Sequence, residues 1–131
     1  MQSKFLARHA QTVMLAMTVM LGVLLAGHDT ASAASCDAFA GKELYNCLAN
    51  KLERVAAMSS RSPETQTALQ KAASQLRVAV NKVQALSAIS QARSVLTGVI
   101  QRAKSAGQDY SGLVRVTDVL SYAARLIQSK G

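Results

Sequence analysis

Side chains suited to acid–base chemistry are scarce in this chain, and the scarcity limits what the protein can do. The sequence has no tryptophan, one proline and only two histidines, His9 and His28. Both histidines precede the segment that we predict to be the mature protein, so that segment has no histidine to act as a general base near neutral pH. Its acids are scattered, and none forms a recognisable catalytic pair. The sequence therefore predicts a protein that is not an enzyme.

Metal and cofactor sites are disfavoured for the same reason. Without histidine, a zinc site would depend on two cysteines alone, and no cluster of acids has the spacing of a calcium-binding loop. The mature segment also has no glycine-rich phosphate loop and no dinucleotide fingerprint. We therefore predict no metal site and no cofactor, and we expect the protein to act by binding.

The amino terminus has the three-part pattern of a secretory signal peptide. Lys4 and Arg8 precede an apolar stretch at residues 13–26, and a short polar run follows it. These 14 residues are fewer than the roughly 20 that a membrane-spanning helix needs, which disfavours an uncleaved anchor. Small residues of the kind that a signal peptidase requires then predict cleavage after Ala33, with Ala34 as the alternative.

A bacterial lipoprotein is the rival interpretation, because small residues precede Cys36. Against it, the third position before the cysteine is Ala33 rather than Leu or Val, and nine residues separate Cys36 from the apolar stretch. We therefore expect an exported protein, periplasmic or secreted. Residues 1–33 are its predicted signal peptide, and residues 34–131 are predicted to form a single helical domain.

The only two cysteines, Cys36 and Cys47, both belong to the mature segment. The oxidising compartment that an exported protein enters favours a disulfide between them. Eleven residues of continuous helix would hold the pair about 16 Å apart, whereas a disulfide needs Cα atoms within about 7 Å. The helix that contains Cys47 therefore cannot continue back through Cys36, and we expect the chain to turn at Gly41.

Apolar residues at spacings of three and four predict helices along the mature segment, where no strand-like alternation is sustained. Ser62 before Pro63 and Glu64 is a helix start signal, and Gly107 is expected to end a helix. The fold class is predicted to be all-α, a small antiparallel bundle of three to four helices with one disulfide at its N-terminal end. The expected helices cover residues 42–58, 63–86, 90–106 and 112–129.

The phase of the apolar residues places the boundary between the second and third helices. At 100° per residue, the apolar side chains of residues 69–83 share one direction, and those of residues 92–103 point to roughly the opposite side. A single straight helix would have to bury opposite faces in its two halves. We therefore predict a turn within residues 85–91, near Ser87 and Ser90. The alternative is one long helix over residues 63–106, which would require a partner chain and favour a homo-oligomer.

The middle of the chain is basic, because no acid occurs between Glu64 and Asp109. Removal of the leader takes Lys4 and Arg8 from 15 bases and Asp29 from 7 acids, so the mature net charge is 13 minus 6, or +7. Four of the six bases in the acid-free segment are spaced eleven residues apart, which is close to three helical turns. The six form a candidate surface for an anionic partner: Lys71, Arg77, Lys82, Arg93, Arg102 and Lys104.

Two functions fit these observations, and a solvated basic face that only maintains solubility is the competing interpretation of the six bases. The first function is an exported, non-catalytic binding or adaptor protein of the cell envelope that contacts a protein partner. The second is a cationic binder of an anionic envelope surface, either lipid head groups or polysaccharide. Nucleic acid fits less well, because the basic segment has no aromatic residue on which bases could stack.

Overall fold

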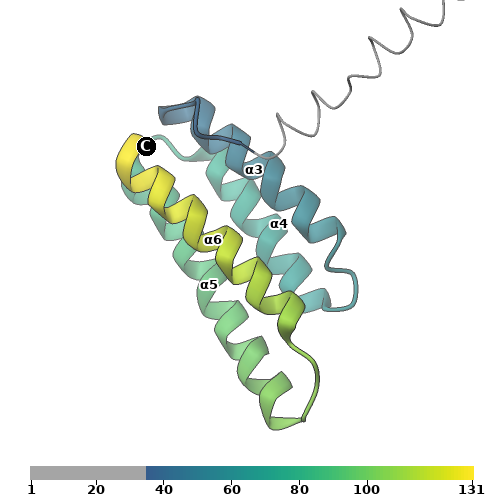
Figure 1. Cartoon of the computed structure of the whole chain (residues 1–131). Helices are drawn as coiled ribbons and strands as arrows, with labels where there is room; N and C mark the ends of the chain where they lie inside the picture. Colours follow the sequence, from purple (N-terminus) through teal and green to yellow (C-terminus); the bar gives the residue numbers. More distant parts are fainter. Residues whose placement is uncertain (1–34) are drawn as a thin grey trace, which may run out of the picture. The chain divides into compact units, whose positions relative to one another are not determined.

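The computed structural model describes residues 35–131, and the predicted signal peptide lies outside these residues. Four helices run antiparallel to their neighbours and are joined by connections of three to five residues (Figure 1). No strand occurs in the described part of the chain. The predicted all-α bundle is therefore confirmed, with these helices: α3 (Gly41–Ala57), α4 (Pro63–Val78), α5 (Lys82–Ser105) and α6 (Ser111–Lys130).

The four helices do not pack equally closely. α4 packs along both α3 and α5, whereas α6 packs on α5 and touches α3 through a smaller contact. We call the end that contains Cys36 the disulfide end and the opposite end, with the α3–α4 and α5–α6 connections, the distal end. At the distal end α5, the longest helix, reaches beyond the α3–α4 connection (Figure 1).

Leucine and isoleucine side chains from all four helices form the core, and burying each contributes about 1.5–3 kcal/mol. Alanine occupies many of the remaining buried positions, where its small side chain lets neighbouring helices approach closely. Tyr45 is the one aromatic residue in the core of the described chain. The largest fully buried apolar side chains are Leu44, Leu48, Leu52, Leu69, Leu76, Ile89, Leu96, Leu120 and Ile127.

The start of α4 and the end of α5 follow the local signals in the sequence. The Ser62 hydroxyl accepts a hydrogen bond from the Thr65 amide at 3.4 Å, and Pro63 is the first helical residue. Gly107 has a φ of +67°, and the Gln108 amide donates to the Ala103 carbonyl at 2.9 Å. This bond closes the α5 terminus as a glycine cap, so both predicted boundaries are confirmed.

The break between α4 and α5 is present but lies closer to the N-terminus than predicted. The helices are separated by residues 79–81, whereas the phase analysis placed the turn within residues 85–91. Ser87 and Ser90 belong to α5, where both are exposed. The prediction was wrong because it treated two exposed valines, Val80 and Val83, as part of the buried stripe; they are 78% and 75% exposed.

Side-chain capping explains why α5 begins at Lys82. The Asn81 side chain accepts a hydrogen bond from the Gln84 amide at 2.9 Å, and the Gln84 side chain accepts one from the Val80 amide at 2.9 Å. These reciprocal bonds satisfy backbone amides that the first turn of a helix leaves unpaired. The break divides residues 63–106 into two helices that pack on each other, so the alternative of one long helix is not observed.

The predicted disulfide is confirmed, and it holds a short N-terminal arm, residues 36–40, against the bundle. Cys36 is fully buried, and its Cα lies 5.8 Å from that of Cys47 on α3. Gly41, where we expected the chain to turn, has a φ of +57°. The disulfide is consistent with an exported protein. No helix in residues 35–131 is long and apolar enough to cross a membrane.

Candidate functional site

The tertiary structure divides the six bases that we predicted as one anionic-partner surface. Arg77 forms an ion pair with Glu53 of α3 at 2.9 Å and donates to the Asn50 side chain at 2.6 Å. Arg102 forms an ion pair with Glu64, the first acid of α4. The segment is therefore acid-free along the chain but not in space, because neighbouring helices place carboxylates beside two of its bases.

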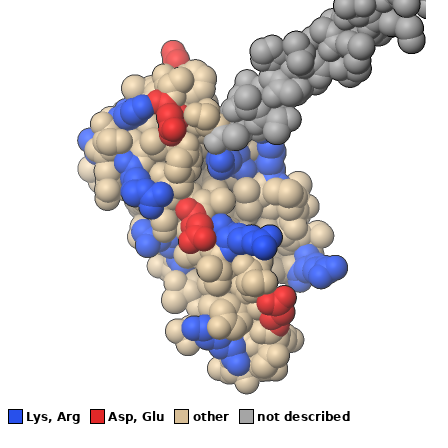
Figure 2. All heavy atoms as spheres, in the orientation of Figure 1, with Lys and Arg blue, Asp and Glu red and all other residues tan. Residues whose placement is uncertain are grey.

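The four bases spaced eleven residues apart are also separated. The turn at residues 79–81 leaves Lys71 on α4, whereas the other three lie on one face of α5. The Lys82 ammonium donates to the Gln128 carbonyl at 3.0 Å, and the Lys104 ammonium lies 5.3 Å from the centroid of the Tyr110 ring. Figure 2 shows acids interspersed with the Lys and Arg side chains on the face it presents, without a single basic patch.

Lysines at the disulfide end stabilise the fold. Lys42 donates to the backbone carbonyls of Arg77 and Ala79, which links the start of α3 to the end of α4. Lys130 donates to the Asp37 carbonyl and so links the end of α6 to the arm. Positive charge at carbonyl-rich helix ends is favourable, and these lysines are therefore already engaged within the fold.

A groove of about 990 Å³ opens at the distal end of the bundle. The end of α3 and the α3–α4 connection form one side, and the C-terminal part of α5 and the N-terminal part of α6 form the other. The groove lies where α5 and the α5–α6 connection reach beyond the α3–α4 connection (Figure 1). Aliphatic residues line it: Val55, Met58, Val99, Ala103, Ala106, Leu113, Val116 and Val119.

Charged and hydroxyl side chains surround this aliphatic surface. Arg61, Arg102 and Arg115 line the groove together with two acids, Glu64 and Asp109. Three serines of the α3–α4 connection, Ser59, Ser60 and Ser62, also line the groove. Among the described residues, neither Arg61 nor Arg115 forms an ion pair within 4.0 Å. The groove therefore combines an aliphatic floor with guanidinium groups that remain available to carboxylates.

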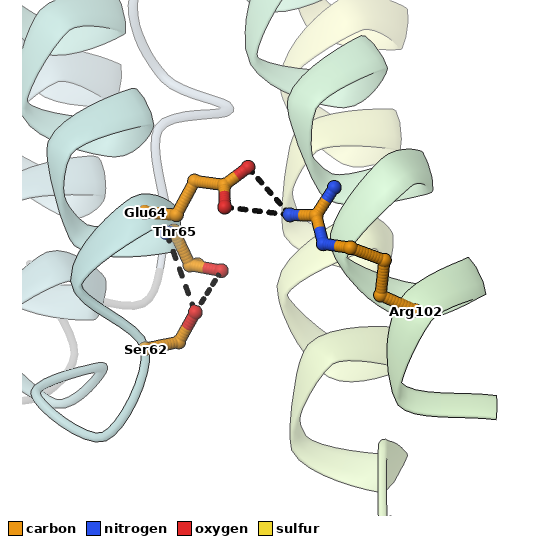
Figure 3. A network of polar contacts seen from close by, with 4 residues as sticks. All are labelled: Ser62, Glu64, Thr65 and Arg102. Carbon is orange, nitrogen blue, oxygen red and sulfur yellow. Dashed lines mark hydrogen bonds and ion pairs between the residues drawn. The ribbon is translucent and has the colours of Figure 1, made fainter. Parts of the chain in front are cut away.

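Glu64 and Arg102 connect the two walls of the groove (Figure 3). One guanidinium nitrogen of Arg102 lies 2.6 and 2.7 Å from the two carboxylate oxygens of Glu64. Beside this pair the Ser62 hydroxyl, which caps α4, donates to the Thr65 hydroxyl at 2.8 Å. The side chains of Arg102 and Glu64 are 63% and 55% exposed, so water screens their attraction and the ion pair contributes little to stability.

Asp109 forms a second acidic position at the start of α6. Its carboxylate accepts a hydrogen bond from the Ser111 amide at 3.0 Å. The backbone and side-chain hydrogen bonds from Ser111 hold the pKa of Asp109 below its usual value, and the positive charge of Arg115 lowers it further. Asp109 is thus an ionised acid that orders the loop before α6.

Binding is the chemistry that this arrangement supports. Aliphatic side chains of a partner can pack on the floor, and carboxylates can pair with the arginines, whose planar guanidinium groups suit two-point contacts. In residues 35–131 no three His, Cys, Asp or Glu side chains cluster as metal ligands. The fold and groove together define a class: a disulfide-linked antiparallel four-helix bundle with an open groove at one end. Comparisons with protein-family models, curated proteins and solved structures find no match to this chain.

Of the three groove arginines, only Arg102 was among the six bases predicted from the sequence. Arg61 and Arg115 lie outside the acid-free segment that contains those six bases. The aliphatic floor was not recognised as a site because Val99 and Val116 follow the same spacing of three and four residues as the buried apolar residues. The sequence pattern therefore predicted that both belong to the core. The expected helix lengths carried no signal of the groove either, because α5 begins at Lys82 and is longer than the third helix expected over residues 90–106.

Proposed function

We propose that this protein is an exported, non-catalytic binding or adaptor protein of the cell envelope that contacts a protein partner through the distal groove. The groove carries this proposal, because its aliphatic floor and polar rim correspond to the usual anatomy of a protein interface. Arginine, which is enriched at such interfaces, occurs three times around it. The disulfide supports the location, since disulfides persist in oxidising compartments outside the cytosol.

Site-specific photo-cross-linking tests this function. A photo-reactive amino acid placed at Met58 or Gln108, which line the groove, should cross-link the exported protein to one partner in solubilised envelope material. The same amino acid at Ser74 or Ser90, both exposed on α4 and α5, provides the matched control. Absence of a stoichiometric cross-linked partner from every position would contradict the function.

The effect of salt on binding distinguishes the proposed function from the alternative, a cationic protein that binds an anionic envelope surface. Attraction to an anionic lipid or polysaccharide surface is screened within about 8–10 Å at physiological salt and more strongly above it. A partner held by aliphatic contacts in the groove should remain bound after a wash in high salt. The proposal is wrong if retention on envelope material disappears in modest salt and depends equally on Lys71 and Arg93, which lie away from the groove.

A further inference from the structure

We propose that the distal groove recognises an acidic, aliphatic polypeptide segment, and that a carboxylate of the partner replaces Glu64 as the ion-pair partner of Arg102. This inference rests on the proposed function and specifies the chemistry of the partner. The aliphatic side chains of the segment would contact Met58, Val99 and Val119, while its carboxylates would contact the surrounding arginines.

Charge complementarity identifies the partner as acidic. The groove has three arginines and two acids, so its lining has a net charge of +1. Asp109 is engaged by Ser111, and Glu64 is engaged by Arg102. Neither Arg61 nor Arg115 forms an ion pair within 4.0 Å among the described residues, and Arg115 interacts with Asp109 only at longer range. A basic segment would meet uncompensated like charge at the same positions.

The exposure of the Glu64–Arg102 pair makes it exchangeable. Both side chains are more than half exposed, and Arg102 uses a single guanidinium nitrogen for both carboxylate oxygens. An incoming carboxylate could therefore pair with Arg102 without removing a buried contact. Glu64 then acts as an internal competitor of the partner, and removing its charge should strengthen binding.

The polar rim favours a polypeptide over a lipid. Ser59, Ser60 and Ser111 line the groove beside the aliphatic floor. The Ser59 hydroxyl donates to the Val55 carbonyl and that of Ser111 to Asp109, but each hydroxyl oxygen can still accept a hydrogen bond. An acyl chain makes no hydrogen bonds and would cover these hydroxyls without replacing the water they lose. A polypeptide can supply backbone and side-chain partners for them. The groove is moreover not enclosed, so an acyl chain seated in it would stay partly in contact with water.

Synthetic peptides test the inference on the exported protein, purified with its disulfide formed. The first probe is a helical peptide of about 14 residues, or four turns, with a leucine stripe flanked by glutamates. The second has glutamine at each glutamate position, and the third has lysine. Fluorescence anisotropy should show binding of the glutamate peptide, roughly tenfold weaker binding of the glutamine peptide and no binding of the lysine peptide.

Variants of the protein give effects of opposite sign. Arg115→Gln and Arg61→Gln should each weaken binding of the glutamate peptide about three- to tenfold, because one charge-assisted contact is lost. Glu64→Gln should strengthen it about threefold, because Arg102 is released from its internal partner. Glu53→Gln is the matched control, since it removes the acid of the other exposed ion pair, which lies outside the groove. It should leave binding unchanged.

Several outcomes would overturn the inference. Equal binding of the glutamate and glutamine peptides would remove the role of charge, and weaker binding by Glu64→Gln would contradict the competition. Binding of phosphatidylglycerol vesicles that Arg115→Gln abolishes, with no peptide bound, would assign the groove to lipid. If photo-cross-links to a protein form only from Ser74 or Ser90, the adaptor function stands while the groove assignment fails.

Discussion

Two glycines adopt backbone conformations that other residues rarely adopt, and a third does not. Gly41 and Gly107 have positive φ angles, whereas Gly98 lies in the middle of α5. A Cβ added at Gly107 would meet no atom within 4 Å, and one at Gly98 would make only an ordinary contact with Arg102. Backbone conformation rather than space should therefore decide the effect of alanine at each position.

We expect Gly107→Ala and Gly98→Ala to change stability in opposite directions. Gly107→Ala should lower the free energy of unfolding by about 1 kcal/mol, because a Cβ is disfavoured in the left-handed region. Gly98→Ala should raise it by about 0.5–1 kcal/mol, because glycine loses more conformational freedom in a helix. Urea unfolding followed by circular dichroism measures both. A loss of stability in Gly98→Ala would show that the helix needs glycine there for another reason.

Tyr122 joins α6 to the N-terminal arm through its hydroxyl group. The hydroxyl donates to the Asp37 carboxylate at 2.8 Å and accepts from the Cys36 amide at 3.4 Å. Burial raises the pKa of Tyr122, and the hydrogen bond to Asp37 raises it further. Because the folded pKa lies above the unfolded one, this stabilisation is complete below the unfolded value of about 10 and is lost as pH rises through the folded value.

Tyr122→Phe should lower the free energy of unfolding by about 0.5–1 kcal/mol at neutral pH, since both hydrogen bonds are lost. Above about pH 10 the wild-type protein should lose stability more steeply than the variant. Denaturant unfolding at a series of pH values measures this difference. Parallel pH profiles for the two proteins would show that the hydroxyl contributes no pH-dependent stability.

At the scale of the secondary-structure elements, the α4–α5 turn decides how the basic middle of the chain is arranged. Asn81 is extended, with φ −152° and ψ 170°, and Lys82 is the first residue of α5. Proline suits the first position of a helix and favours an extended residue before it. Ser87, five residues later, lies inside the helix, where proline removes a backbone hydrogen bond and clashes with the preceding turn.

Proline should therefore have very different effects at these two positions of α5. Lys82→Pro should cost about 1 kcal/mol or less, mainly through loss of the hydrogen bond to Gln128. Ser87→Pro should cost about 3 kcal/mol or more. Thermal unfolding of both variants provides the comparison. Tolerance of proline at Ser87 together with strong destabilisation at Lys82 would indicate that the turn lies within residues 85–91, as the phase of the apolar residues predicted.

At the scale of the whole molecule, the disulfide reinforces the side of the bundle that packs least. The α3–α6 contact is smaller than the other contacts between neighbouring helices. The arm that begins at Cys36 is bonded to α3 by the disulfide and to α6 by Tyr122 and Lys130. The arm therefore connects the two helices that have the least direct contact.

Removal of both cysteines should destabilise the contact between α3 and α6 more than the other helix contacts. A Cys36→Ser, Cys47→Ser double variant should lose up to about 3 kcal/mol of unfolding free energy, given the short loop that the disulfide closes. Hydrogen exchange should accelerate most in α6 and in the first turns of α3. Tyr122→Phe with the disulfide intact is the control for loss of the arm contacts alone. Uniform acceleration across all four helices would contradict a local role.

Local signals determined much of the fold from the sequence alone. The Ser62–Pro63 start and the Gly107 cap depend on neighbouring residues, and Cys36 pairs with Cys47 because the sequence has no other cysteine. The apolar spacing identified helices because each helix must bury one stripe. The turn at residues 79–81 was predicted in the wrong place, within residues 85–91, because the spacing of apolar residues cannot distinguish an exposed valine from a buried one.

Only the tertiary structure decided the arrangement of charge and the existence of the groove. Arg77 and Arg102 belong to an acid-free segment, yet adjacent helices place Glu53 and Glu64 beside them. The groove lies where α5 and the α5–α6 connection reach beyond the α3–α4 connection, and the packing of the helices brings Arg61 and Arg115 from distant parts of the chain to this one opening. Such proximity depends on the packing of whole helices, which no single stretch of sequence encodes.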